Sequence, residues 1–316
     1  MSHNHVLDQL VRRIAQLIVT VVATSTAIFV LIHAAGDPTQ GFLQPGASPE
    51  ARAQVRERLE LDAPLWKQYL AFLGRTFRVD FGDSWRDRQP ALDAVLQRLP
   101  STLLLAATAT LLAVAGGVIL ALAVSSLRRP VIRRIVDLGA LLGQGIPAFW
   151  LGTILILLFA VRLGWFPASG NDGWRTLVLP AMTLAAYPAS VVYRLLMTEL
   201  ASVERQPYIA TARSKGLRER VVRLRHALPN AATPALAYIG VQLGFLVGGT
   251  VVVESVFAYP GVGRLALQAA SERDLPVVHA FAVVVAVLIV AIGMAIDLAS
   301  VTIDPRLGQA EAGRLS

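Results

Sequence analysis

The sequence predicts an all-helical membrane protein with six membrane-spanning helices. Of its 316 residues, 55% are hydrophobic and only 16% are charged, whereas soluble domains carry about 25% charged residues. Apolar runs of about 20 residues, the length that crosses a bilayer, recur along the chain. There is no cysteine, which excludes disulfides, thiolate nucleophiles and zinc–thiolate sites.

The first apolar run, Ile14 to His33, follows Arg12-Arg13 and is predicted to be a retained membrane-spanning helix. A signal peptide has a shorter apolar core that ends at a small-residue cleavage site, and this run is too long for one. Residues 1–33 are therefore predicted to form a cytoplasmic N-terminal segment and the first span.

The polar segment 34–99 is predicted to be a helical extracytoplasmic insertion between the first and second spans. The spacing of its apolar residues predicts helices over Pro49–Leu61 and Leu65–Phe77. A further short helix over Ala91–Leu99 is expected to lie at the membrane interface. Two roles stay open for the insertion: a lid without a specific partner, or a docking surface for a binding protein.

Residues 100–316 are predicted to form the membrane-embedded core, with five more spans. These are Thr102–Leu127, Ile135–Val161, Leu177–Leu200, Ala235–Glu254 and His279–Ile303. Lys and Arg are concentrated in the segments that this topology places inside, including the loop 201–234, so both termini are predicted to be cytoplasmic. Glu254 is expected to begin an outer loop and face water, and His33 and His279 to lie at an interface.

Small residues and prolines mark features within these spans. Gly240, Gly244 and Gly248 repeat at four-residue spacing, which favours close helix packing in lipid over incidental glycine. Prolines interrupt predicted spans at Pro147, Pro180 and Pro188. Each proline frees a carbonyl that needs another partner, which favours a translocation path over a simple anchor.

Arg194 and Asp297 are charged residues within predicted spans, each near the inner end. An unpaired charge in lipid is costly, so we expect these two side chains to pair. The alternative is that Arg194 extends to the interface and meets water there.

The segment Pro207–Pro234, between the fourth and fifth predicted spans, is expected to carry the function. Pro207 suits the first turn of a helix, and Gly216 suits the left-handed conformation that ends it. A second helix is predicted from Leu217 to about Leu228, with Pro229 ending it. Both helices have an apolar and a basic side.

This segment resembles the cytoplasmic loop of permeases of ATP-driven importers, which reads Glu-Ala-Ala, three residues, Gly, nine residues, Ile, one residue, Leu-Pro. Gly216, Leu228 and Pro229 fit that pattern, and three positions depart from it: Ala210, Thr211 and His226. The peptide-permease branch reads Tyr-x-x-Thr-Ala-x-x-Lys-Gly-Leu, which the chain matches throughout. The matching residues are Tyr208, Thr211, Ala212, Lys215, Gly216 and Leu217.

Other stretches resemble the same branch in order and spacing. They are residues 98–102, 163–170, 254–257, 260–264, 274–276 and 304–306. The resemblance therefore covers nearly the whole chain, and it is to the first membrane subunit of dipeptide/oligopeptide/nickel-type importers.

This resemblance implies the type I ABC importer permease fold in a bacterial cytoplasmic membrane. The implied partners are a second homologous permease, two ATP-binding subunits and an extracytoplasmic substrate-binding protein. The chain has no Gly-x-x-x-x-Gly-Lys-Ser/Thr phosphate-binding loop. No cofactor or metal is therefore expected in this chain, and ATP and Mg²⁺ would be bound by the ATPase subunits.

The cargo implied first is a di- or oligopeptide, with nickel, haem, glutathione or another small solute as alternatives. An ATP-independent secondary transporter is a second hypothesis, but it would need coupling charges near the bilayer midplane and usually an internal repeat. A membrane enzyme is a third, for which no catalytic motif is present. The net charge of +8 lies at the ends of apolar segments, which indicates membrane topology and not nucleic-acid binding.

Overall fold

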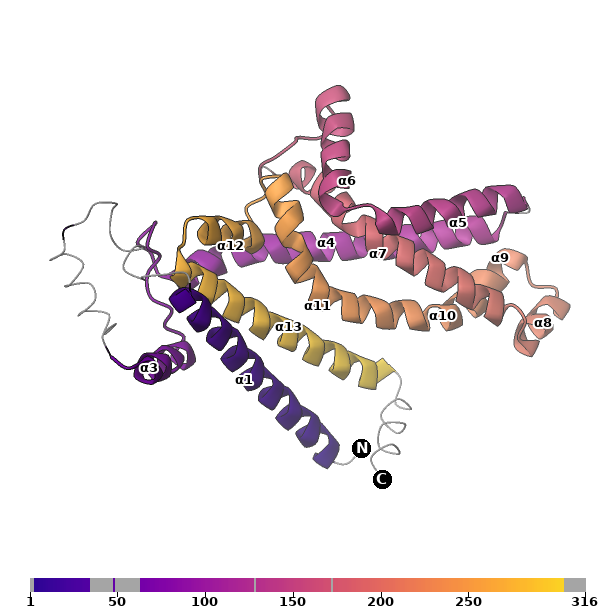
Figure 1. The fold of residues 1–316 in the computed structure, drawn as a ribbon. Coiled ribbons are helices and arrows are strands. Elements are labelled where there is room, and N and C mark those ends of the chain that lie inside the picture. Colours follow the sequence, from indigo (N-terminus) through magenta and orange to yellow (C-terminus); the bar gives the residue numbers. More distant parts are fainter. Residues whose placement is uncertain (1–2, 35–47, 49–62, 128, 172, 304–316) are drawn as a thin grey trace. The chain divides into compact units, whose positions relative to one another are not determined.

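The computed structural model describes residues 3–34, 48, 63–127, 129–171 and 173–303, and only the backbone at 3–10, 243, 245–247 and 297–303. These residues are almost entirely helical and fall into two compact units, Met1–Ser101 with Gly261–Ser316 and Thr102–Pro260 (Figure 1). The last two helices thus belong with the N-terminal unit, although we predicted one core over 100–316. The predicted helix Pro49–Leu61 lies outside the described residues.

The first unit is built on two long helices, α1 (His3–Ala34) and α13 (Leu275–Ile303), which lie side by side (Figure 1). They run in opposite directions, because Ser25 contacts His279 whereas Arg13 lies beside Gly293. The short helix α12 (Val262–Ser271) precedes α13 and was not predicted. Helix α3 (Leu65–Phe77) has the predicted bounds.

Helix α4 runs from Ala91 to Ser125 without a break, so the prediction of a separate interfacial helix over Ala91–Leu99 was wrong. Its first turns are buried against α12 and α13: Ala91, Ala94 and Val95 pack with Val262, Leu265 and Val277. The apolar face continues past Pro100, which lies inside the helix. A proline there removes one helical hydrogen bond but leaves the buried face continuous.

The second unit surrounds α7 (Trp174–Val203), which packs against α5 (Pro130–Gly145), α6 (Ala148–Leu155) and α11 (Thr233–Val256). Tyr193 and Leu196 of α7 are fully buried. Pro180 and Pro188 lie within α7 and do not end it. Helix α4 approaches α7 closely at Gly117, where an added Cβ would lie 2.6 Å from Cγ1 of Val192.

The predicted span Ile135–Val161 is broken in two. Helix α5 (Pro130–Gly145) is followed by α6 (Ala148–Leu155) and the π-helix η2 (Ile156–Arg162), and the chain bends by 110° between α5 and α6. The break falls at Ile146, which is extended (φ −78°, ψ 121°) because a residue before proline avoids the helical region.

Four helices among the described residues are long and apolar enough to span a membrane, and the bent pair raises the number to at most five. They lie in α1, α4, α7 and α13. Helix α11 covers the fifth predicted span, Ala235–Glu254, but does not count among these five. The described part of the chain therefore supports an all-helical, multi-pass protein, and six spans stay a prediction.

Candidate functional site

The segment that the sequence singled out folds as a helix, a turn and a second helical stretch at the end of α7. Helix α8 (Pro207–Ser214) begins with proline in its first turn, as predicted. The N–H of Lys215 donates to the carbonyl of Thr211 at 3.2 Å, and the N–H of Gly216 donates to that of Arg213 at 3.0 Å. These bonds satisfy two carbonyls at the helix end.

Gly216 adopts φ +77°, which confirms the predicted left-handed conformation. Side chains with a Cβ are strained in this region, by about 1–2 kcal/mol. An added Cβ at Gly216 would meet no atom within 4 Å. Backbone conformation, and not lack of space, therefore explains why glycine suits this position.

The second helical stretch differs from its prediction in both bounds and geometry. It consists of α9 (Glu219–Val221), the π-helix η3 (Val222–Ala227) and α10 (Leu228–Ala231). It begins two residues after Leu217, and Pro229 does not end it. Pro229 lies in the first turn of α10, a position that tolerates proline.

An ion pair joins the two helices across the turn. Nε and Nη2 of Arg213 donate to the two carboxylate oxygens of Glu219 at 3.1 and 2.7 Å. This hydrogen bonding lowers the pKa of Glu219 and raises that of Arg213. Arg223 adds a second set of contacts, with its Nε 3.5 Å from Glu219 and 3.7 Å from Glu204 at the end of α7.

The inner side of this segment is a small hydrophobic core shared with α7. Ile209 and Ala212 of α8 and Val222 of η3 pack with Leu200 and Val203 of α7. The helix pair is thus held to the end of a long membrane helix by apolar burial.

The same segment exposes several large apolar side chains and several basic ones. We call the four exposed residues Tyr208, Leu217, Val221 and Leu224 the apolar ridge. Two of the motif residues, Tyr208 and Leu217, lie on this ridge. Thr211 and Lys215 are exposed, Ala212 is buried beneath, and Leu228 is half-buried against α7.

The two predicted intramembrane charges are not brought together by any described contact. Nη1 of Arg194 donates to Oε1 of Gln144, on α5, at 3.2 Å. The side chain of Asp297 lies outside the described residues, so its pairing with Arg194 stays a prediction. A carboxylate that we did not single out, Asp137, accepts a hydrogen bond from Tyr193 at 2.5 Å.

The glycine stripe on α11 also stays a prediction. At Gly248, an added Cβ would have no neighbour within 4 Å. The close helix contacts in this unit lie at other glycines, Gly117 of α4 and Gly152 of α6. At Gly152, an added Cβ would lie 3.0 Å from the ring of Phe257.

Glu254 does not face water, so that prediction was wrong. It lies within α11 and is fully buried, where it accepts a hydrogen bond from Oγ1 of Thr102 at 2.7 Å. His279 is likewise buried, within hydrogen-bonding distance of Ser25 at 3.2 Å. Neither burial is signalled by the local sequence, because each partner is far along the chain.

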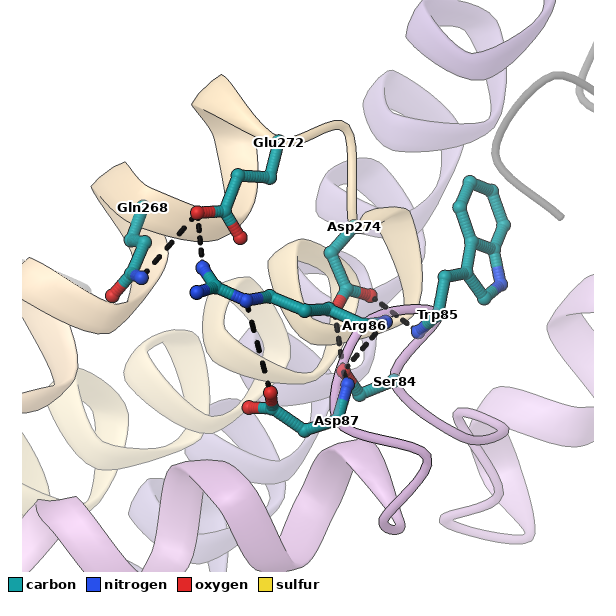
Figure 2. A network of polar contacts seen from close by, with 7 residues as sticks. All are labelled: Ser84, Trp85, Arg86, Asp87, Gln268, Glu272 and Asp274. Carbon is teal, nitrogen blue, oxygen red and sulfur yellow. Dashed lines mark hydrogen bonds and ion pairs between the residues drawn. The ribbon is translucent and has the colours of Figure 1, made fainter. Parts of the chain in front are cut away.

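A second polar cluster, in the first unit, was also missed (Figure 2). The buried carboxylate of Asp274, just before α13, accepts hydrogen bonds from Oγ of Ser84 at 2.5 Å and from the N–H of Trp85 at 3.2 Å. Arg86 pairs with Glu272 at the surface of the same cluster. These contacts fasten the loop before α4 to the junction of α12 and α13.

The described residues bring together no group of three or more His, Asp or Glu side chains that could hold a metal ion. The candidate site combines a turn closed by hydrogen bonds and an ion pair, a buried apolar underside, and exposed apolar and basic side chains.

Comparison with known families gives two matches. Residues 113–309 match the family described as binding-protein-dependent transport system inner membrane component. Residues 6–106 match the N-terminal region of the membrane components of such systems. The candidate site lies within the first match.

Individual relatives are similar over almost their full length. The chain is 35% identical over 302 residues to the glutathione transport system permease protein GsiC of Salmonella choleraesuis (strain SC-B67) and to that of Escherichia coli (strain K12). Each alignment covers 95% of this chain and 99% of the relative.

Two solved structures share the fold. One is an amino acid ABC transporter, with a TM-score of 0.51 at 20% identity, covering 65% of this chain and 92% of the other. The other is the MetNI methionine ABC transporter in an inward-facing conformation, with a TM-score of 0.51 at 18% identity, covering 68% and 95%.

Proposed function

Because this chain belongs to the binding-protein-dependent transport system inner membrane components and is a permease subunit of an ATP-driven importer, we propose that it forms a path for small peptides. It resembles the first permease type of the peptide and nickel family. In this proposal a second, homologous permease completes the path, and both termini lie in the cytoplasm. The chain itself is a transporter subunit and not an enzyme.

The segment 207–231 is, in this proposal, the contact with one of two ATPase subunits, which bind ATP and Mg²⁺. The observation that carries the proposal is the apolar ridge of Tyr208, Leu217, Val221 and Leu224. In a protein interface, buried apolar and aromatic side chains contribute most of the affinity, whereas exposed charges at the rim contribute little.

The geometry supports a mechanical role for this contact. The turn is closed by the backbone at Gly216 and by the Arg213–Glu219 pair, and the underside packs on the end of α7. A movement of the ATPase would therefore move the helix pair and α7 as one body. Rigid-body switching of this kind is a common form of conformational change in proteins.

Co-purification of the assembled importer tests the proposed contact. Leu217→Glu/Leu224→Glu places two carboxylates on the ridge and should reduce the amount of ATPase recovered with the permease by at least tenfold. Ser202→Glu adds a carboxylate at an exposed position outside the ridge and should leave recovery unchanged. Full recovery of the ATPase with the ridge variant would overturn the assignment of this surface.

Short peptides are the cargo that we propose, because the loop matches the peptide-permease pattern. The relatives named as glutathione permeases make glutathione the first alternative, followed by nickel and haem. A thermal-shift assay on the cognate binding protein, with di- and oligopeptides, glutathione and nickel as separate ligands, distinguishes these cargoes. A shift with glutathione or nickel alone would refute the peptide assignment.

A further inference from the structure

Helix α3 has one face that is fixed to the membrane-spanning helices of its unit. Tyr69 Oη lies 2.7 Å from Oγ1 of Thr26, and Gln68 Oε1 lies 3.2 Å from Nε2 of His33, both on α1. On α13, the ring of His279 stacks on Phe72 with centroids 4.3 Å apart. This face of α3 is therefore in contact with α1 and α13.

These contacts also place α3 beside the C-terminal part of α1. Gln68 contacts His33, near the end of α1, whereas Phe72 contacts Phe29. Thr76 lies 3.4 Å from His279, which in turn lies beside Ser25. Thus α3 packs against residues 25–33 of α1, a length of about 12 Å, inside the candidate span Val11–Ala34.

The face of α3 that points away from α1 is apolar and exposed. Trp66, Leu70 and Phe77 are 61%, 58% and 56% exposed. At 100° per residue they fall within about 40° of one another around the helix, and we call them the outward stripe. A row of large apolar side chains on a surface indicates a site that another apolar phase covers.

The charges on α3 and on its C-cap residue have one sign. Helix α3 contains Lys67 and Arg75 and is followed by Arg78, and it has no acidic residue. The Lys67 ammonium lies 5.5 Å from the centre of the Trp66 ring. A Trp next to a Lys at the end of a span is typical of the level of the lipid headgroups.

We propose that the outward stripe is embedded in lipid, at the boundary of headgroups and acyl chains beside the C-terminal end of α1. Lys67 and Arg78 then contact the phosphates of anionic lipids. The neighbouring part of α1 also exposes apolar side chains, because Val30 and Leu31 are 57% and 64% exposed. The inference requires only that α1 spans the membrane and is independent of the cargo.

Lipid and a docked protein are the two ways to cover such a stripe, and the contacts favour lipid. Because the opposite face of α3 is fastened to α1 over the length of a span end, the stripe is held at membrane depth. Amphipathic helices with basic flanks and a Trp bind membrane surfaces in this way.

Fluorescence quenching in the whole transporter tests the inference, and the absence of native cysteine permits single labels. Leu70→Cys on the stripe and Arg75→Cys on the far side of α3 are each labelled with an environment-sensitive dye. The labelled complexes are reconstituted in nanodiscs with 5-doxyl phosphatidylcholine, and retained ATPase activity confirms assembly. We expect at least threefold stronger lipid quenching at position 70 than at 75, and the reverse for aqueous iodide.

Two results would overturn the proposal. One is a label at position 70 that iodide quenches as strongly as at 75. The other is a label that only the added binding protein shields, which would make the stripe a protein-docking surface.

The proposed contact of Lys67 and Arg78 with anionic lipid is tested separately with spin-labelled phosphatidylglycerol. It should quench position 70 more than spin-labelled phosphatidylcholine does, and Lys67→Glu/Arg78→Glu should remove that difference. An unchanged difference would refute the role of these two cations.

Discussion

Arg213 and Glu219 join two helices across Gly216 through a two-pronged ion pair, with hydrogen bonds of 3.1 and 2.7 Å. Paired hydrogen bonds between a guanidinium and a carboxylate restrict direction as well as distance. The pair therefore fixes the angle between α8 and α9, while glycine permits the turn itself. A stiff turn is what a part that transmits motion to α7 requires.

Charge reversal tests this stiffening role. Arg213→Glu and Glu219→Arg should each lower transport several-fold, because like charges then face each other across the turn. The double variant Arg213→Glu/Glu219→Arg restores attraction and should recover much of the transport. The measurement is substrate uptake per ATP hydrolysed in proteoliposomes. If the double variant were no better than the worse single one, the pair would have no positioning role.

The same pair sets an expectation for pH. The lowered pKa of Glu219 means that the pair is fully charged above the ordinary Glu value of about 4.3, and its contribution is lost only as pH falls through the still lower folded value. Transport between pH 6 and 8 should therefore respond equally to pH in the wild type and in Glu219→Gln. A pH dependence in this range that Glu219→Gln abolished would contradict the direction of the shift.

Two substitutions of Gly216 distinguish a requirement for its backbone conformation from a requirement for a small side chain. Gly216→Val should abolish transport, because a β-branched residue resists φ +77°, while the protein still inserts in the membrane. Gly216→Asn should keep much of the activity, since asparagine tolerates the left-handed region and the site has room for a side chain. Uptake assays with membrane-extraction controls distinguish the two. Equal loss in both variants would point to a steric requirement instead.

Local sequence signals predicted the parts of this structure that depend on neighbouring residues. Helix α3 has the predicted bounds, because proline before it and apolar spacing within it are local. The positive φ of Gly216 was predicted for the same reason. The π-helical turn of η3 has no such signal, so the second helix of the candidate site was misplaced.

Contacts between residues far apart in the chain could not be predicted from the sequence. Glu254 ends an apolar run and was expected in water, yet Thr102 meets it from 152 positions away. Ser84 and Asp274, 190 positions apart, gave no sign of their contact. The break at Ile146 had a local signal, Pro147. The prolines at 180 and 188 lie within α7 and do not break it, so a proline in an apolar run does not by itself distinguish a break from a continuous helix.

The buried hydrogen bond between Thr102 and Glu254 yields a stability prediction. Thr102→Val removes a hydroxyl that donates to a buried carboxylate, and such a loss costs about 1–3 kcal/mol. Thr102→Ser keeps the hydroxyl and should cost less. The thermal midpoint of the purified complex in detergent should fall clearly for Thr102→Val and little for Thr102→Ser. Equal midpoints for both variants would show that the hydroxyl contributes nothing.

Adjacent glycines of α4 provide a matched pair for the packing of the second unit. An added Cβ at Gly117 would lie 2.6 Å from Cγ1 of Val192 and 2.9 Å from the carbonyl oxygen of Ala189, whereas at Gly116 it would meet nothing within 4 Å. Gly116 also borders a cavity of about 290 Å³ that α5 and α7 help to line. Gly117→Ala must therefore push α4 away from α7, and overpacking of this kind costs about 1–3 kcal/mol.

Gly116→Ala should instead be neutral or slightly stabilising, because alanine favours helix by about 1 kcal/mol over glycine. Both variants make the same chemical change one position apart, so a difference in their thermal midpoints reports the contact with α7 and not helix propensity. Gly117→Ala combined with Val192→Ala, which removes the facing methyl groups, should recover part of the loss. Recovery would be incomplete, because Cβ of residue 192, at 2.8 Å, and the backbone oxygen of Ala189, at 2.9 Å, both remain. A stable Gly117→Ala protein would mean that α4 and α7 are further apart in the membrane.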